Sequence, residues 1–397
     1  MDYTKLQNDI NKFWDDEIVP TLTDYIKIPN KSPAFDPQWK ENGHMDKVLH
    51  LAKEWVEKYR PENSTLHIKE VENRTPIMLL EIPGDRDGNI LMYGHLDKQP
   101  EMEGWNDELG PWKPVMKDEK LYGRGGADDG YALFASVGSI LALKDQGVSL
   151  PRIVLLIEFC EESGSPDLPF YMSECNSIIG EVDLVICLDS GAGNYDQFWT
   201  TVSLRGMISC NLKVQVLNEG VHSGSSSGVV PSSFRLIRQL ISRIENEETG
   251  EILLPELSCE VPEFRLIEAQ KMAENLNGNA ESFPWHKTTS SMAQTTVDGL
   301  LGRTWKPTLS IVGAGGLPSI ENGGNVLRPY TELKLSFRLP PNVDSKRAMN
   351  AVSKILTDDP PNNASVTVDW DEPANGWSAP KLSDWLEGTI NDASQLF

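Results

Sequence analysis

The sequence is short of basic residues. Its 397 residues include 36 lysines and arginines against 59 aspartates and glutamates, which gives a formal net charge of −23 at pH 7. Nucleic acid and anionic membrane surfaces would repel such a chain, so we expect it to bind neither. The sequence also has no apolar run that approaches membrane-spanning length. These deficits argue against a nucleic-acid-binding protein and against a membrane protein.

Cysteine is scarce, and a secretion signal is lacking. The five cysteines are odd in number, show no CxxC spacing and lie in several cases inside apolar runs. We therefore expect reduced core residues rather than a disulfide framework. The N-terminal segment has no basic stretch followed by an apolar core. Both observations predict a cytoplasmic protein, in which the sequons at Asn63, Asn73 and Asn363 would stay unused.

The first half of the chain alternates between helical and strand-like patterns, and its length suggests two or more domains. Apolar residues recur at helical spacing over 3–28 and 45–59, and residues 131–143 form an apolar run typical of a buried helix. Strands alternating with helices predict an α/β domain with a mixed sheet flanked by helices. The expected strands lie at 65–71, 77–82, 90–93, 153–159 and 184–188.

The composition changes near residue 200. Strand and helix patterns then follow in the order β-α-β-β-α-β, which is the split, ferredoxin-like α+β pattern. A segment at 255–306 interrupts this order, and the sequence does not place it. We expect an inserted second domain, after which the chain returns to the first one. The expected elements are strands at 202–216, 308–312, 330–339 and 364–370 and helices at 229–247 and 346–356.

Acidic and histidine residues gather where the expected strands of the first domain end, and an aspartate pair follows a glycine-rich turn before the apolar helix. Ligands collect beyond the carboxyl ends of strands in α/β sheets. Hard oxygen donors with one imidazole, gathered at such an edge, predict a metal site. The residues concerned are His95, Asp97, Asp128, Asp129, Glu161, Glu162 and Asp189.

Each of these residues also has a plainer interpretation. His95 could be a core histidine whose hydrogen bonds are satisfied within the protein, and Asp97 could be an exposed carboxylate. The aspartate pair could cap the N-terminus of the following helix, and the glutamate pair could simply be solvated. Capping needs only one carboxylate, however. The glutamates follow a nearly uninterrupted apolar run, so they are expected to be half-buried, where mutual repulsion would raise one pKa.

Together these motifs resemble the co-catalytic zinc metallopeptidases, a family of cytosolic non-specific and carnosine dipeptidases, glutamate carboxypeptidases and aminoacylases. The resemblance covers nearly the whole chain, in the expected order and spacing. It implies a catalytic domain at 1–199 and 375–397, interrupted by a lid domain at 200–374 that also forms a homodimer. The matching motifs lie at 94–97, 123–129, 161–165, Asp189, His222 and Arg338.

The resemblance also implies a role for each residue of the metal site. It implies two zinc ions, with manganese or cobalt as alternatives, bridged by Asp128. Asp97 would orient the imidazole, Glu161 would be the general base on the water between the metals, and the peptide bond after Asp128 would be cis. The implied ligands are His95, Asp128, Glu162 and Asp189.

Three further residues match substrate contacts of the family. His222 would stabilise the oxyanion from the partner subunit's lid, although a loop histidine can simply face solvent. Arg338 would hold a substrate carboxylate, with an internal salt bridge as the alternative. Asn325 resembles another substrate contact of the lid.

The function predicted from these features is metal-dependent hydrolysis of dipeptides, or of the C-terminal residue of short peptides, by a hydroxide that bridges the metals. An N-acyl-amino-acid deacylase using the same site is one alternative. A catalytically inactive cation-binding or dimerisation protein is another. Relatives use a further histidine ligand near the end of the catalytic domain, whereas the only histidine after His222 here is His286. We therefore expect a final segment to be absent, with weakened metal binding in a truncated or inactive form.

Overall fold

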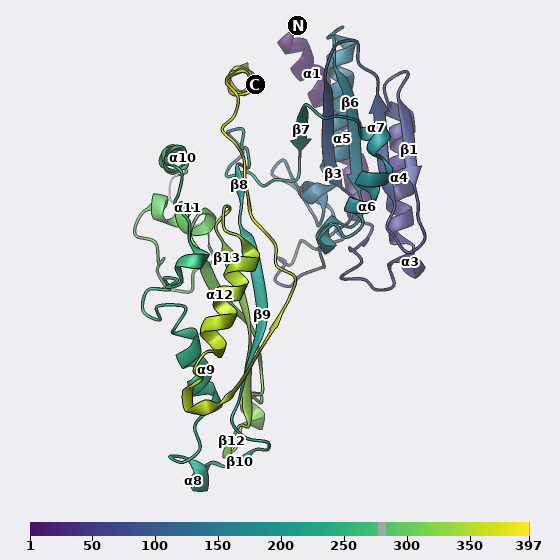
Figure 1. Ribbon diagram of the computed structural model, residues 1–397. Helices are drawn as coiled ribbons and strands as arrows, with labels where there is room; N and C mark the ends of the chain where they lie inside the picture. The colour runs from purple at the N-terminus through teal and green to yellow at the C-terminus, as the bar shows by residue number, and fades with distance from the viewer. Residues whose placement is uncertain (277–282, 397) are drawn as a thin grey trace. The chain divides into compact units, whose positions relative to one another are not determined.

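A computed structural model describes residues 1–276 and 283–396, and the chain forms two compact units (Figure 1). Unit 1 comprises Met1–Trp199 together with Thr389–Phe397, and unit 2 comprises Thr200–Gly388. Each unit has its own hydrophobic core. Within the described part of the chain, no helix combines the length and apolar character needed to cross a membrane. The roles of catalytic domain and lid stay predictions.

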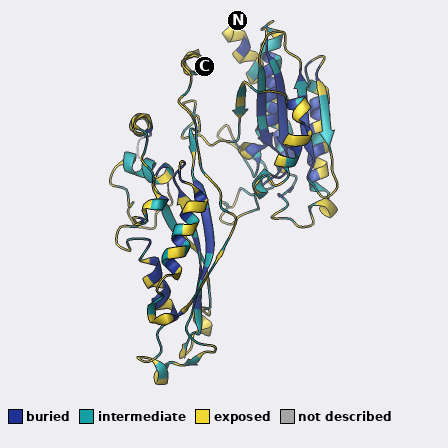
Figure 2. Cartoon of the chain, viewed as in Figure 1, coloured by how far each residue is buried: buried dark blue, intermediate teal, exposed yellow. Residues whose placement is uncertain are grey.

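Unit 1 is built on a five-stranded mixed sheet in the order β1-β2-β6-β3-β7. β1, β2 and β6 pair antiparallel, whereas β3 runs parallel to both β6 and β7. β2 and β6 are buried along nearly their whole length because apolar side chains pack on both faces (Figure 2). The strands are β1 (Thr65–Lys69), β2 (Ile77–Ile82), β3 (Asn89–His95), β6 (Arg152–Glu158) and β7 (Leu184–Cys187).

Helices cover both faces of this sheet. Buried side chains of α2, α4 and α5 form one apolar cluster with it, and those of α6 and α7 form a second cluster on the other face. The predicted α/β fold with a mixed sheet flanked by helices is therefore confirmed. The helices are α1 (Tyr3–Phe13), η1 (Trp14–Ile18, a π turn), α2 (Val19–Ile26), α3 (Trp39–Asn42), α4 (His44–Tyr59), α5 (Tyr131–Asp145), α6 (Leu168–Glu174) and α7 (Asn176–Ile179).

Unit 2 contains a four-stranded sheet in the order β11-β13-β9-β14, with every neighbouring pair antiparallel. Two helices pack on one face, and along β13 buried residues alternate with less buried ones (Figure 2). The expected ferredoxin-like arrangement is present. Its elements are β9 (Gly206–Gln215), α9 (Ser233–Ile241), β11 (Thr308–Gly315), β13 (Tyr330–Leu339), α12 (Ser345–Thr357) and β14 (Ser365–Trp370).

The segment that the sequence left unplaced forms α10 and α11 between α9 and β11. Arg265 of α10 is buried and donates hydrogen bonds to the carbonyl oxygens of Val202 (3.0 Å) and Ala379 (2.7 Å). Val202 directly precedes β8 and Ala379 directly follows β15, and these two strands pair with each other. The chain therefore stays in unit 2 beyond residue 375 and up to Gly388. The elements are β8 (Ser203–Leu204), η4 (Pro255–Leu257), α10 (Glu263–Asn275), α11 (Thr296–Thr304) and β15 (Trp377–Ser378).

Short elements complete the two units. Those that bear on the site are η2, which precedes α5, and η3, which follows β6. The short elements are β4 (Val115–Lys117), β5 (Lys120–Tyr122), η2 (Gly126–Gly130), η3 (Glu161–Ser163), β10 (Val221–His222), α8 (Ser223–Ser226), η6 (Ile320–Asn322), β12 (Val326–Leu327), η7 (Pro361–Asn363) and α13 (Asp384–Leu396).

Candidate metal centre

The candidate ligands of unit 1 lie at one edge of its sheet because three parallel strands end there. β3 and β6 are neighbours in which His95 pairs with Glu158, the last residue of each strand. η3, which holds Glu161 and Glu162, begins shortly after β6, and Asp189 follows the end of β7. This edge is the usual place for ligands in α/β sheets.

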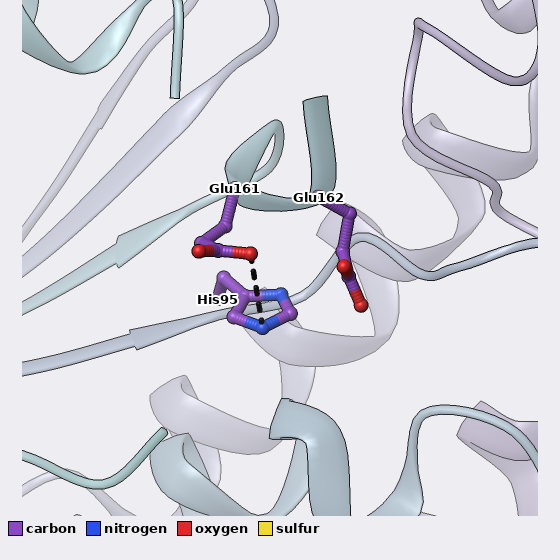
Figure 3. Close-up of side chains that lie close together, drawn as sticks. All are labelled: His95, Glu161 and Glu162. Atoms are coloured by element: carbon purple, nitrogen blue, oxygen red, sulfur yellow. Dashed lines mark ion pairs between the residues drawn. The ribbon is translucent and has the colours of Figure 1, made fainter. Parts of the chain in front are cut away.

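His95 lies among carboxylates from three other segments. Its Nε2 atom is 3.4 Å from Oδ1 of Asp128, 3.8 Å from Oδ2 of Asp189 and 3.9 Å from Oε2 of Glu161. The imidazole is fully buried, whereas the carboxylates are only partly so. Figure 3 shows Glu161 and Glu162 projecting from η3 beside the imidazole ring.

Two sets of side chains could each hold a cation. One set is His95 with Asp128 and Asp189, and the other is His95 with Glu161 and Glu162. In each set the ligand atoms lie within 4.8 Å of one another. The structure therefore brings together the four predicted ligands and the predicted base, while their individual roles stay predictions.

The donor set of this cluster fits a divalent cation. Nε2 of His95 and Oε1 of Glu162 are buried and have no hydrogen-bond partner among the described residues. A buried polar atom without a partner is destabilising, so such atoms usually indicate a missing ligand or a catalytic role. Imidazole nitrogen and carboxylate oxygen are donors that zinc and manganese accept in proteins. A cation held by both atoms would satisfy them together.

The charges of the cluster perturb its pKa values strongly. Burial lowers the pKa of His95, but the interactions with Asp128 and Asp97 outweigh it and raise that pKa to about 12. Burial raises the pKa of Glu161 to about 7, and repulsion from Asp189 adds to this shift against the attraction of His95. The expected repulsion is therefore present, but burial is the larger cause. A metal would have to displace the proton from the imidazole.

Asp97 connects the imidazole to the glutamate pair. Its Oδ1 atom is 3.3 Å from Nδ1 of His95, which fits the predicted orienting role. The same carboxylate accepts hydrogen bonds from the backbone N–H groups of Glu161 (3.0 Å) and Glu162 (2.9 Å). These two bonds were not predicted, because the sequence does not show which backbone groups face a side chain. Asp97 thus fixes η3 relative to the end of β3.

Asp129, the second aspartate of the pair, supports β3 from within the core. The Asp128–Asp129 peptide bond is cis, as the resemblance implied. Asp129 is buried and accepts a hydrogen bond from the backbone N–H of His95 (3.1 Å). A Cβ atom at Gly94 would lie 2.6 Å from Cβ of Ala132 and 2.8 Å from Oδ2 of Asp129. Glycine at position 94 therefore lets the start of α5 pack directly on β3.

Lys98 is a buried cation near the site that the sequence analysis missed. Its Nζ atom donates to the carbonyl oxygens of Tyr25 (2.7 Å) and Ile28 (2.8 Å), and burial lowers its pKa well below the usual range. A Cβ atom at Gly125 would lie 2.6 Å from Cε of Lys98, so the glycine-rich turn packs on this side chain. Its only signal in the sequence is its position directly after Asp97.

The three residues predicted to contact substrate lie in unit 2. His222 is exposed at the end of β10 and pairs with Val326 of β12, and the carbonyl oxygen of Asn325 accepts a hydrogen bond from the N–H of Ser223 (2.9 Å). His222 and Asn325 are therefore close neighbours. Arg338 lies near the other end of the unit's sheet, exposed on β13. Among the described residues of unit 2, no carboxylate forms an ion pair with Arg338, and its role stays a prediction.

A mixed α/β sheet with carboxylates and one imidazole at its strand ends, together with a ferredoxin-like unit, places the chain in the class of two-unit α/β proteins with a candidate metal centre. Comparison with family models gives the particular family, because residues 91–393 match Peptidase family M20/M25/M40. The chain belongs to this family, as the sequence motifs indicated.

Curated relatives and solved structures agree with this membership. The Beta-Ala-His dipeptidase of Rattus norvegicus is 25% identical over 342 residues, which span 83% of this chain and 68% of that protein. The Cys-Gly metallodipeptidase DUG1 of Saccharomyces cerevisiae is 28% identical over 296 residues, or 70% of this chain and 59% of that protein. The solved structure of the di-peptidase Dug1p from Saccharomyces cerevisiae matches the fold with a TM-score of 0.72 and 22% identity, covering 96% of this chain and 82% of that one.

Proposed function

We propose that this protein is a dinuclear metallopeptidase that hydrolyses dipeptides or removes the C-terminal residue of short peptides. The observation that carries the proposal is the cluster of one buried imidazole and four carboxylates from separate segments at one sheet edge. The relatives named as dipeptidases support the choice of dipeptides as substrates.

His95, Asp128, Glu162 and Asp189 would hold the two cations, zinc or alternatively manganese or cobalt. When bound, these ions would polarise the scissile carbonyl and lower the pKa of a water molecule. Asp97 keeps the imidazole of His95 oriented, since its carboxylate lies beside Nδ1 and leaves Nε2 directed to the other carboxylates.

Glu161 is the group that we propose to carry the proton. Its carboxylate is half-buried, lies within the cluster, and has a pKa raised to about 7, chiefly by burial. A general base with a pKa near the working pH can take a proton from water and return it to a leaving amine. Asp97 holds the backbone of Glu161 in place for both transfers.

Unit 2 supplies the proposed contacts to the peptide, as the lid and dimerisation domain of a homodimer. The exposed guanidinium of Arg338 is free to hold a carboxylate with two parallel hydrogen bonds. Asn325 and His222 lie side by side on the β10–β12 ribbon, where an amide and an imidazole can bind the peptide backbone or an oxyanion.

The decisive experiment is a substrate panel on the purified chain with zinc, manganese or cobalt added. We expect β-Ala-His or Cys-Gly to be hydrolysed, the activity to disappear with a chelator, and added metal to restore it. Hydrolysis of N-acetylated amino acids without hydrolysis of dipeptides would instead identify a deacylase. Metal binding without hydrolysis of either class would identify a cation-binding protein.

His222 provides a test of the proposed dimer. If His222 acts in the active site of the partner subunit, His222→Ala and Glu161→Gln chains should each be inactive alone. Mixing them after mild dissociation should restore up to about a quarter of the activity, because one site of each heterodimer would then contain neither substitution. Heterodimers that form without any recovery would contradict a shared site.

A further inference from the structure

Three arginines of unit 2 lie near one another, since the charges of Arg338 and Arg303 both act on Arg205. Arg338 lies on β13, Arg205 immediately precedes β9, and Arg303 lies in the last turn of α11, just before β11 begins. The helices α9 and α12 cover one face of the sheet. Arg303 and Arg338 are exposed and Arg205 is half-buried, so the cluster can be reached from solvent.

The strand register brings two of these arginines together. Arg338 pairs with Met207 of β9 and with Thr308 of β11. Arg205 precedes Met207 by two residues, so its side chain projects to the same face. The Nη1 atom of Arg205 lies 3.4 Å from the hydroxyl of Thr308, the residue opposite Arg338. Thr308 thus contacts Arg205 through its hydroxyl and is the strand partner of Arg338.

None of the three arginines forms an ion pair with a carboxylate in the part of the chain that the structure describes. Burial lowers the pKa of Arg205, and repulsion from Arg338 and Arg303 lowers it further. The protein carries 59 acidic residues, so this deficit of carboxylates is specific to the cluster. Adjacent like charges destabilise a free site and favour the binding of an anion.

Other cations of the same sheet do have partners. Lys334 on β13 pairs with Asp371 at 3.0 Å, and Lys213 on β9 lies 4.4 Å from the ring centre of Tyr330. The lysines are therefore balanced by groups of the sheet itself, whereas the three arginines are not. The exposed guanidinium groups are therefore available to an anion from outside the sheet.

We infer that Arg205, Arg303 and Arg338 form a binding site for a ligand with two carboxylates, so that the preferred peptides end in aspartate or glutamate. The peptide preference rests on the proposed function, in which Arg338 holds the α-carboxylate. One guanidinium suffices for one carboxylate. The additional charges of Arg205 and Arg303 match a second carboxylate, which a C-terminal acidic residue carries on its side chain.

The first test compares isosteric substrates. We expect kcat/KM for Gly-Glu to exceed that for Gly-Gln by about tenfold, because a neutral amide forms weaker hydrogen bonds with arginine than a carboxylate does. Arg303→Gln should remove most of this preference, measured as the ratio of the two kcat/KM values. Arg235→Gln is the matched control, since Arg235 is exposed on α9 and α9 packs on the other face. Equal preference in wild type and Arg303→Gln would overturn the peptide preference.

The second test measures binding without catalysis. Calorimetry should show that succinate binds the full chain more tightly than succinamate, and that Arg303→Gln and Arg205→Gln each weaken succinate about tenfold at unchanged metal content. Equal binding of the two ligands would overturn the inference, and so would tighter binding of inorganic phosphate that depends on the same arginines. Arginine-dependent succinate binding in a chain that cleaves no peptide would leave the dicarboxylate site intact and refute only the proposed function.

Discussion

Glu161→Gln should lower kcat by about 10²- to 10⁴-fold, because glutamine is nearly isosteric with glutamate but cannot accept a proton. The fold should persist, since the contact between Asp97 and residue 161 is made by the backbone N–H. Metal content should also persist, because the predicted ligands are other residues. Steady-state kinetics with β-Ala-His or Cys-Gly, together with metal analysis of the same samples, measures both quantities.

The matched control is Glu181→Gln, an exposed glutamate of unit 1 away from the sheet edge that holds the ligands. It should retain full activity. The structure also allows Glu161 to share a cation with His95 and Glu162. If Glu161→Gln lost an ion as well as its activity, Glu161 would be a ligand rather than the base. Near-normal turnover would exclude both roles.

Substitution of the aspartates should affect the two cations unequally. At saturating metal, which offsets the weakened binding expected without a further histidine ligand, the dinuclear proposal gives two ions per wild-type chain. Asp128→Ala should lose both, because the proposed bridging carboxylate would contact each ion. Asp189→Ala and Glu162→Ala should each lose one. Loss of an outer-shell partner typically lowers metal affinity by about 10- to 100-fold. Loss of a ligand should lower the affinity of the affected site by more than that. Calorimetric titration and metal content after dialysis give the stoichiometry of each variant.

The control for this series is Asp87→Ala, since Asp87 is exposed in the turn between β2 and β3. It removes one negative charge from unit 1 without touching the site, and it should still bind two ions. Loss of only one ion from Asp128→Ala would contradict a bridging role. A single ion in the wild-type chain would contradict the dinuclear proposal.

Much of the fold follows from short-range patterns. The helix predicted at 45–59 and the strand predicted at 330–339 agree with α4 and β13 to within a residue, because the apolar spacing of each segment fits only one type of secondary structure. The helix expected at 229–247 is shorter in the structure, since α9 spans only Ser233–Ile241. The segment around α10 could not be placed from sequence, because it depends on long-range contacts such as those of Arg265.

The residues of the candidate centre were predictable because each one ends a strand, follows a strand or follows a glycine-rich turn, so parallel strands bring them to one edge. Their supporting contacts were not. Asp97 bonds to η3, and Lys98 bonds to the carbonyl oxygens of Tyr25 and Ile28 at the end of α2. These bonds join segments whose proximity in space no local sequence pattern indicates. The arginine cluster of unit 2 was hidden for the same reason, since only the register of β9, β11 and β13 brings it together.

The candidate ligands come from four separate segments of unit 1, and that arrangement has a thermodynamic consequence. An unfolded chain does not gather these segments, so a cation bound by all of them would bind only the folded state. Its affinity would then add to the free energy of unfolding of unit 1, by about 2.7 kcal/mol at a concentration 100 times Kd. Unit 2 contributes none of these ligands. Metal should therefore raise the melting temperature of unit 1 and leave that of unit 2 unchanged.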